Sequence, residues 1–272
     1  MTDFAPQYER NERGWILFPS DVSRRKQLFV LESMSHTAKA NIYMVEALVE
    51  YCSKPGDAVM DIFGGTGTLM VGHHVGRVVW LMELNPVFVG LIKKNIAKVT
   101  ADGPPLVIFQ EGACQELLKG HSSVQAIITS PPYAGTFGKN SANFKEMNET
   151  ELRYHQSMLT YIDDSKKRGN LAPYNLAAMT NFMFNKELEK IYKLSFDVIR
   201  AGGYFALIIK DRIKGGVREE LGMASVQMMT KIGFKIDRWE RWLPPGTWFA
   251  QMARTKGQVW VDEEQLIIMR RP

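Results

Sequence analysis

The stretch Asp61-Ile62-Phe63-Gly64-Gly65-Thr66-Gly67-Thr68 decides the fold. It begins within the run 58–62, which reads as a buried strand, and it leads into a helix-like segment that carries Leu69, Met70 and Val75. Glycines in such a turn let the backbone approach a ligand, and the helix that follows offers free N–H groups. The order strand, glycine turn, helix predicts an α/β fold that binds a nucleotide-type cofactor.

Two acids beside this turn narrow the choice of ligand. Asp61 stands before the glycines, where its charge repels a pyrophosphate but attracts an ammonium group. Glu83 ends a second predicted strand, 77–83, where an acid can accept both ribose hydroxyls. Met70 stands where a dinucleotide-binding turn has Gly or Ala, which counts against a nicotinamide enzyme. An ammonium, a ribose and no phosphate fit S-adenosylmethionine; the alternative is that both acids are solvated strand ends.

Outward from the turn, apolar runs alternate with amphipathic stretches, which is typical of a mostly parallel sheet with helices on both faces. Asn85 and Pro86 favour a helix start, as N-cap and first residue, and this helix is expected to reach Val99. Further strands are predicted at 106–109, 124–129, 203–209, 233–239 and 265–269, and further helices at 38–51, 180–200 and 219–231.

A second motif, Thr129-Ser130-Pro131-Pro132-Tyr133, follows the predicted strand 124–129. Because proline fixes φ and lacks an N–H group, the carbonyls of Ser130 and Pro131 remain free acceptors at the carboxyl end of the strand. Such acceptors suit an exocyclic amine, and the ring of Tyr133 can stack on a base drawn out of its duplex. The alternative is a structural proline turn beside an aromatic core residue.

Together the two motifs resemble those of the S-adenosylmethionine-dependent amino-methyltransferases that methylate N4 of cytosine or N6 of adenine in DNA. The resemblance implies a Rossmann-like methyltransferase domain: a seven-stranded, mostly parallel sheet with helices on both faces and an antiparallel final strand at 265–269. Softer similarities at 36–39 and 201–207 extend it over residues 28–240. The serine form of the motif is more often associated with cytosine N4, although many such enzymes carry the two motifs in the opposite order.

The resemblance also implies roles for individual residues. The catalytic set is Ser130, Pro131, Pro132 and Tyr133: Ser130 and the Pro131 carbonyl hold the amine for direct in-line methyl transfer, and Tyr133 stacks on the base. The expected cofactor contacts are His36, Lys39, Asp61, Phe63, Gly64, Gly65, Gly67, Thr68, Glu83 and Thr129.

The chain departs from the family pattern at three positions. Ile62 and Thr37 replace prolines, and Ala113 falls where the family often has an acid that contacts the adenine of the cofactor. Backbone groups, or Glu111 in a shifted register, are the alternatives for that contact.

The net charge of +5 is concentrated downstream of the catalytic motif. Residues 210–218 carry four cations against one acid, and residues 231–256 carry six against two. DNA is the expected partner and RNA the alternative. The other interpretation of residues 210–218 is a solvated basic loop, and that of residues 239–258 is a packed aromatic flap. The candidate nucleic-acid contacts are Lys139, Lys210, Arg212, Lys214 and Arg241.

Length and composition favour a single domain over 1–272, with an inserted recognition or lid segment at 134–178 and an aromatic, basic flap at 239–258. The two cysteines fit a reducing compartment, so a cytoplasmic location is expected, and no apolar run is long enough for a membrane span. The adjacent His73 and His74 lack ligand partners, so no metal is expected.

The sequence therefore predicts a site-specific DNA methyltransferase that uses S-adenosylmethionine and acts on cytosine N4. The same fold acting on adenine N6 or on an RNA base is the first alternative. A non-catalytic nucleic-acid-binding module with a degenerate cofactor fold is the second.

Overall fold

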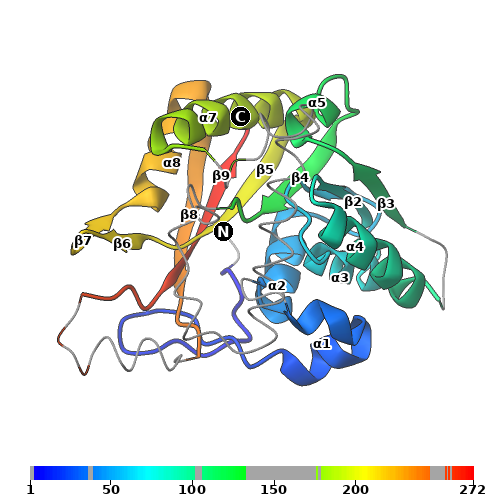
Figure 1. Ribbon diagram of the computed structural model, residues 1–272, viewed down its shortest axis with the longest axis horizontal. Coiled ribbons are helices and arrows are strands. Elements are labelled where there is room, and N and C mark those ends of the chain that lie inside the picture. Colours follow the sequence, from blue (N-terminus) through cyan, green and yellow to red (C-terminus); the bar gives the residue numbers. More distant parts are fainter. Residues whose placement is uncertain are drawn as a thin grey trace.

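The computed structural model describes residues 3–35, 39–101, 106–132, 176, 179–245, 255, 257 and 259–272. Seven strands form its main sheet: β1 (Ala58–Asp61), β2 (Val78–Glu83), β3 (Val107–Glu111), β4 (Val124–Thr129), β5 (Ile199–Ile209), β8 (Lys235–Trp242) and β9 (Glu264–Arg270). Their order across the sheet is β3-β2-β1-β4-β5-β9-β8 (Figure 1). The fold is thus the predicted seven-stranded α/β sheet.

Strand direction agrees with the prediction as well. The pairs β1–β2, β1–β4, β2–β3 and β4–β5 are parallel, whereas β9 runs antiparallel to both β5 and β8. The antiparallel final strand, expected at 265–269, is confirmed as β9. Because β1, β2 and β4 are parallel neighbours, their carboxyl ends meet at one edge of the sheet, where open α/β sheets bind their ligands.

Helices cover both faces of this sheet. They are α1 (Val22–Leu28), α2 (Ile42–Cys52), α3 (Val71–His74), α4 (Pro86–Val99), α5 (Cys114–Leu117), α7 (Asn181–Val198) and α8 (Leu221–Ile232), with short 3₁₀ turns η1 (Leu31–Ser35) and η2 (Thr68–Met70). A separate hairpin joins β6 (Arg212–Lys214) to β7 (Val217–Glu219). In Figure 1, α5, α7 and α8 lie on the side of the sheet opposite to α2.

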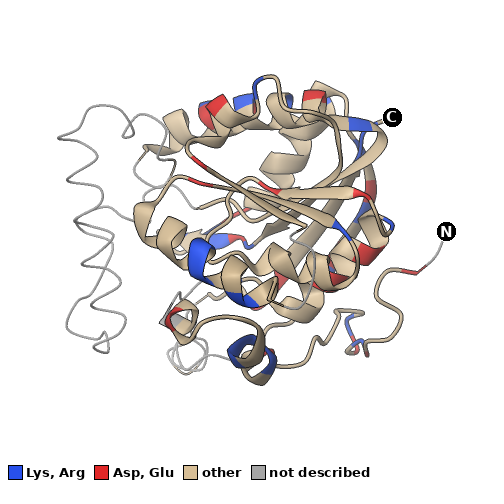
Figure 2. Ribbon diagram, turned by 90° about the vertical axis from the view of Figure 1, so that its right-hand side faces the viewer, with Lys and Arg blue, Asp and Glu red and all other residues tan. Residues whose placement is uncertain are grey.

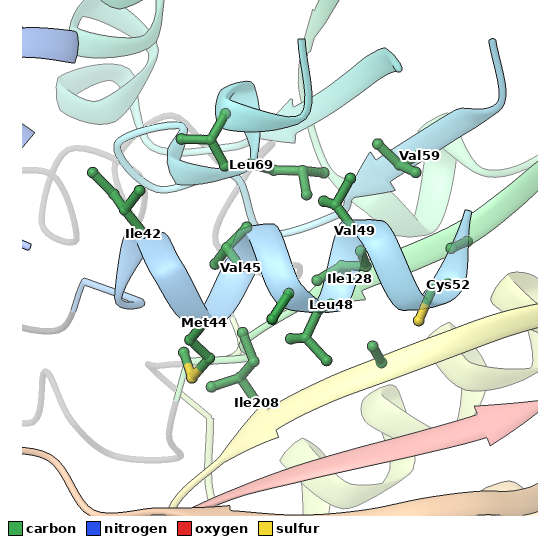
Figure 3. Close-up of a cluster of buried hydrophobic side chains, with 14 of the residues drawn as sticks. Ile42, Met44, Val45, Leu48, Val49, Cys52, Val59, Leu69, Ile128 and Ile208 are labelled. Atoms are coloured by element: carbon green, nitrogen blue, oxygen red, sulfur yellow. The ribbon is translucent and has the colours of Figure 1, made fainter. Parts of the chain in front are cut away.

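The core is divided by the sheet into two clusters, because successive side chains of a strand point to opposite faces. Val59 and Ile128 face the cluster around α2, and their neighbours Met60 and Ile127 face the cluster around α7. Figure 3 shows the first cluster, in which Leu48 and other apolar residues of α2 point toward the strands. Strands buried on both faces explain the continuous apolar runs of the sequence.

Helix ends follow the local capping chemistry. Asn85 accepts the Val87 N–H group and Pro86 is the first residue of α4, so this helix has the predicted bounds. The helix expected at 38–51 begins later, at Ile42, because Asn41 is its N-cap and accepts the N–H groups of Tyr43 and Met44. The helix expected after the glycine turn is shorter than predicted, since a 3₁₀ turn takes up its first residues and Val75 already lies beyond its end.

Several predictions concern parts of the chain that the structure does not describe. Tyr133 lies outside the described residues, and so does the segment 134–178 apart from Leu176. Of the flap 239–258, the structure describes residues 239–245, 255 and 257. No helix in the described ranges has the length and apolarity that a membrane crossing needs.

Replacing Leu48 with alanine tests the first core cluster. Leu48 is fully buried on α2, so Leu48→Ala is expected to lower the free energy of unfolding by about 2–5 kcal/mol. Val217→Ala, at an exposed position of β7, is the control and is expected to change it by less than about 0.5 kcal/mol. Urea unfolding followed by circular dichroism measures both. Equal stability of the two variants would contradict the packing described here.

Candidate functional site

The glycine turn and the Thr-Ser-Pro-Pro turn lie side by side at the carboxyl edge of the sheet. Asp61 ends β1 and Thr129 ends the neighbouring strand β4. The hydroxyl of Thr129 donates a hydrogen bond of 2.6 Å to Asp61 Oδ1. This bond connects the two motifs directly, although 68 residues separate them in the sequence.

The glycine turn is tightly packed and needs its glycines. Gly65 and Gly67 have φ angles of 55° and 84°, in the left-handed region that favours glycine. A Cβ atom at Gly67 would lie 2.4 Å from Met70 Cε, and one at Gly64 would lie 3.1 Å from the Met82 carbonyl oxygen. Glycine is therefore required at 65 and 67 by the backbone conformation and at 64 by close packing against β2.

Glu83, at the end of β2, reaches across to this turn. Its carboxylate accepts the Gly65 N–H group at 2.7 Å and the N–H groups of Leu84 and Asn85 at 2.8 and 2.7 Å. Burial nevertheless raises the pKa of Glu83 to about 7, and the nearby charge of Asp61 adds to this effect. The carboxylate therefore lies where the sequence predicts a ribose contact, held by backbone donors.

Asp61 is held in a similar way. It accepts the Phe63 N–H group at 3.0 Å in addition to the Thr129 hydroxyl, yet burial raises its pKa to about 6. Within the described ranges no lysine or arginine forms an ion pair with Asp61 or Glu83. Desolvated and internally hydrogen-bonded carboxylates argue against the alternative that both are solvated strand ends.

Arg25 is a site residue that the sequence analysis missed. Its guanidinium is almost fully buried and donates to Thr68 Oγ1 at 3.1 Å, to the Ala40 carbonyl at 2.6 Å and to Asp21 at 2.6 Å. It therefore ties α1 to the end of the glycine turn. Arg25 stands between two other cations, Arg24 and Lys26, so the sequence carries no local signal for this role.

Asn95 supports the same turn from α4. Its amide donates to the Thr66 carbonyl and to Ser33 Oγ, both at 2.8 Å, and its Oδ1 accepts the Val30 N–H group at 2.8 Å. The side chain is fully buried. The sequence did hold a signal here, because Asn95 is a polar residue on the apolar face that α4 otherwise buries.

The remaining predicted cofactor residues have mixed placements. The Lys39 ammonium donates to the Met34 carbonyl at 2.9 Å, and burial, with the charge of Arg25, lowers its pKa to about 8. Thr68 is buried against Arg25, and Phe63 is half-buried beside Asp61. His36 lies outside the described residues.

The catalytic turn is described as far as Pro132. Ser130 is exposed, Pro131 is buried and Pro132 is half-buried. An exposed serine directly after a buried strand suits a group that contacts a substrate.

The turn after β3 is where the sequence predicts the contact with the adenine of the cofactor, made by backbone groups or by Glu111. Ala113 is buried and precedes α5, whereas Glu111 is exposed and forms an ion pair of 3.3 Å with Lys93. Glu111 is thus engaged on the surface, which disfavours the shifted register and leaves backbone groups for the expected adenine contact.

The predicted nucleic-acid contacts carry less free charge than the sequence indicates. Arg212 and Lys214 pair with Glu219 at 2.5 and 3.7 Å in the β6–β7 hairpin, and Lys210 lies 5.7 Å from the ring centre of Trp260. Arg241 is exposed on β8, and Lys139 lies outside the described residues. Figure 2 shows Lys and Arg interspersed with Asp and Glu along the helices. His, Cys, Asp and Glu form no cluster in the described ranges that could hold a metal ion.

A seven-stranded sheet with an antiparallel β9, helices on both faces and a glycine turn after β1 defines the Rossmann-like methyltransferase fold. No protein-family model and no curated protein matches the sequence. Many solved structures resemble the chain at low identity, which establishes the fold alone, and three of them are described below.

The first is TrmN from Thermus thermophilus, with a TM-score of 0.51 and 14% identity over 89% of this chain and 52% of that one. The chain thus spans about half the length of TrmN. The second is precorrin 8w decarboxylase from Methanobacterium thermoautotrophicum, with a TM-score of 0.50 and 13% identity over 86% of this chain and 93% of that one. The third is precorrin-6y C5,15-methyltransferase from Geobacter metallireducens, with a TM-score of 0.50 and 10% identity over 99% of this chain and 96% of that one.

Removing the Asn95 side-chain amide tests the support of the glycine turn. Asn95→Ala leaves two buried polar groups and one half-buried N–H group without their partner, so it is expected to lower the free energy of unfolding by about 2–4 kcal/mol. The matched control is Asn185→Ala, at an exposed position of α7. Urea unfolding measures both. If the two variants are equally stable, the Asn95 hydrogen bonds do not hold the turn.

The pKa of Glu83 predicts a pH dependence of stability. Its pKa in the folded chain, about 7, lies above the value of about 4.3 in an unfolded chain, so protonated Glu83 stabilises the fold at low pH. This contribution is lost as the pH rises through about 7. Glu83→Gln should therefore make the fall in unfolding free energy between these pH values shallower. Urea titrations across this range measure it, with the exposed Glu12→Gln as control; an unchanged slope for Glu83→Gln would refute the assignment.

Proposed function

We propose that this chain transfers a methyl group from S-adenosylmethionine to the exocyclic amine of a nucleic-acid base, with cytosine N4 of DNA as the first substrate. The observation that carries the proposal is the hydrogen bond of 2.6 Å between Thr129 and Asp61. It brings the turn expected to hold the cofactor and the turn expected to hold the amine to adjacent strand ends.

The cofactor assignment is supported by the chemistry of the two acids. Asp61 and Glu83 are desolvated and have no cationic side-chain partner in the described ranges, so Asp61 suits the ammonium of the amino-acid moiety. Glu83 suits the ribose hydroxyls, which would replace the Gly65 N–H group as partners of its Oε2. Gly65, half-buried with a φ angle of 55°, leaves backbone without a side chain where the ligand would lie.

The mechanism requires the chain mainly to position and polarise the amine. S-adenosylmethionine supplies a methyl group on a positively charged sulfur. Ser130 Oγ and the Pro131 carbonyl accept the N–H groups of the amine, which draws the nitrogen lone pair out of the ring and toward the methyl carbon. In such a transfer the amine nitrogen would gain the methyl group as the methyl–sulfur bond breaks, and its surplus proton would pass to solvent.

The fold by itself leaves the reaction open. Of the three solved structures named above, one is described as a methyltransferase and another as a decarboxylase. The proposal therefore rests on the two turns and their acids. The fold similarity is compatible with methyl transfer but does not identify the reaction.

Incubation with labelled S-adenosylmethionine and either DNA or RNA, followed by digestion to nucleosides and mass spectrometry, tests the function. N4-methylcytosine in DNA is expected. If N6-methyladenine alone is found, the substrate is adenine N6 and not cytosine N4. If only RNA is labelled, the substrate is an RNA base and not DNA. Binding of nucleic acid without cofactor binding by calorimetry would favour the non-catalytic module.

Two substitutions separate the proposed roles. Asp61→Asn removes the charge that faces the ammonium and is expected to weaken cofactor binding roughly 10- to 100-fold. Ser130→Ala is expected to lower kcat about 10²-fold and to leave the cofactor Kd unchanged. Ser122→Ala, exposed before β4, is the control for Ser130. The reverse pattern, with Ser130→Ala weakening cofactor binding and Asp61→Asn lowering only kcat, would refute the assignment.

A further inference from the structure

A second pocket, of about 470 Å³, opens at the same edge of the sheet, beside β8 and β9. Three tryptophans line it, and each comes from a different segment: Trp15 from the N-terminal segment, Trp239 from β8 and Trp260 from the residues before β9. The volume is large enough for a planar ring system of nucleobase size.

Two of the tryptophans, Trp239 and Trp15, are held by hydrogen bonds, whereas Trp260 is 38% exposed. Trp239 donates its indole N–H to Gln265 Oε1 at 2.9 Å, and Gln265 is itself buried. The backbone N–H of Trp15 donates to Asn11 Oδ1 at 3.0 Å, and the next residue donates to the Arg241 carbonyl at 2.8 Å. The N-terminal segment is thereby fixed along the exposed edge of β8, which presents Trp15 to the pocket.

The rim of the pocket offers both donors and acceptors. Arg218 bridges the buried carboxylates of Asp211 and Glu263 at 2.8 and 2.6 Å. Arg13 and Arg241 are exposed, and neither forms an ion pair within the described part of the chain. Three guanidinium groups stand against four carboxylates in the lining. This balance disfavours an anion as the main ligand and favours a neutral ring with donors and acceptors at its edge.

The position of the pocket relates it to the catalytic turn. Ile209, at the end of β5, pairs with Gln265 of β9, so one strand separates the pocket from β4 and Ser130. Two strand spacings, about 10 Å, separate β4 from β9, and a third brings the distance to β8, which carries Trp239, to about 14 Å. Trp260 lies nearer to the catalytic turn, because the ammonium of Lys210, directly after β5, is 5.7 Å from its ring centre. A nucleotide that neighbours a base held at Ser130 can therefore reach Trp260.

We propose that this pocket binds one base of the substrate, adjacent to the methylated base in the strand, by stacking it on the tryptophans. The proposal rests on the nucleic-acid substrate proposed above. Stacking between a base and an aromatic side chain tolerates any base, while the arginines and carboxylates at the rim read its edge. The pocket thus contributes to the choice of sequence around the target.

Anisotropy of a short fluorescein-labelled single-stranded DNA, and of an RNA of the same sequence, measures binding without requiring methyl transfer. Trp260→Ala is expected to raise Kd for the oligonucleotide about tenfold. Trp260→Phe retains a stacking ring, so its Kd for the oligonucleotide should stay close to that of the unmodified protein. The control is Ile236→Ala, an exposed position of β8 outside the pocket lining. Cofactor affinity, measured by calorimetry, should be the same in all variants.

Replacing single bases of the oligonucleotide with abasic sites identifies the bound base. An abasic site at one position next to the target should lower the affinity of the oligonucleotide for the unmodified protein about tenfold. The same abasic site should lower its affinity for Trp260→Ala only slightly, because that variant already lacks the stacking partner. If Trp260→Ala binds as tightly as the control, or if no flanking abasic site matters, the pocket proposal is wrong while the methyl-transfer proposal stands. If the unmodified protein binds neither DNA nor RNA, the pocket proposal and the nucleic-acid substrate both fall.

Discussion

The hydrogen bond from Thr129 to Asp61 is the interaction on which the candidate site depends. It exists because β1 and β4 are parallel neighbours, so that their last residues meet at one edge of the sheet. It places the glycine turn and the Ser-Pro-Pro turn a fixed distance apart, and in-line transfer between two bound groups is sensitive to such distances. It also gives Asp61 a neutral donor in place of a counter-ion, which leaves the carboxylate free for a cationic ligand.

A second constraint is the satisfaction of polar groups behind the glycine turn. A turn rich in glycine exposes backbone carbonyls and loses much conformational freedom on folding, so it needs partners to stay in one conformation. Asn95 and Arg25 supply these partners from α4 and α1. The N-terminal part of the chain thereby supports the candidate cofactor site through Arg25, and its earlier residue Trp15 lines the second pocket.

Charge at the substrate edge depends on pairing as much as on composition. The basic segment 210–218 contains one acid in sequence, but folding brings Glu219 and Glu263 to its arginines. What remains at this edge is a mixed rim of guanidinium and carboxylate groups around tryptophan rings. Such a rim can discriminate the edge of a base, whereas a uniformly basic surface binds phosphate without reading sequence.

The sequence by itself determined the strand alternation, the order of the sheet through its family resemblance, the bounds of α4 and the acids at the ends of β1 and β2. These features depend on signals a few residues long: apolar runs, the Asn85-Pro86 cap and glycines that allow positive φ. Only the tertiary structure decided that Thr129 meets Asp61, that Asn95 and Arg25 hold the turn, that Glu111 pairs with Lys93 and that three distant tryptophans share a pocket. Each of these joins segments whose separation along the chain carries no local pattern, and each is fixed by burial, which forces polar groups to find partners wherever the fold places them.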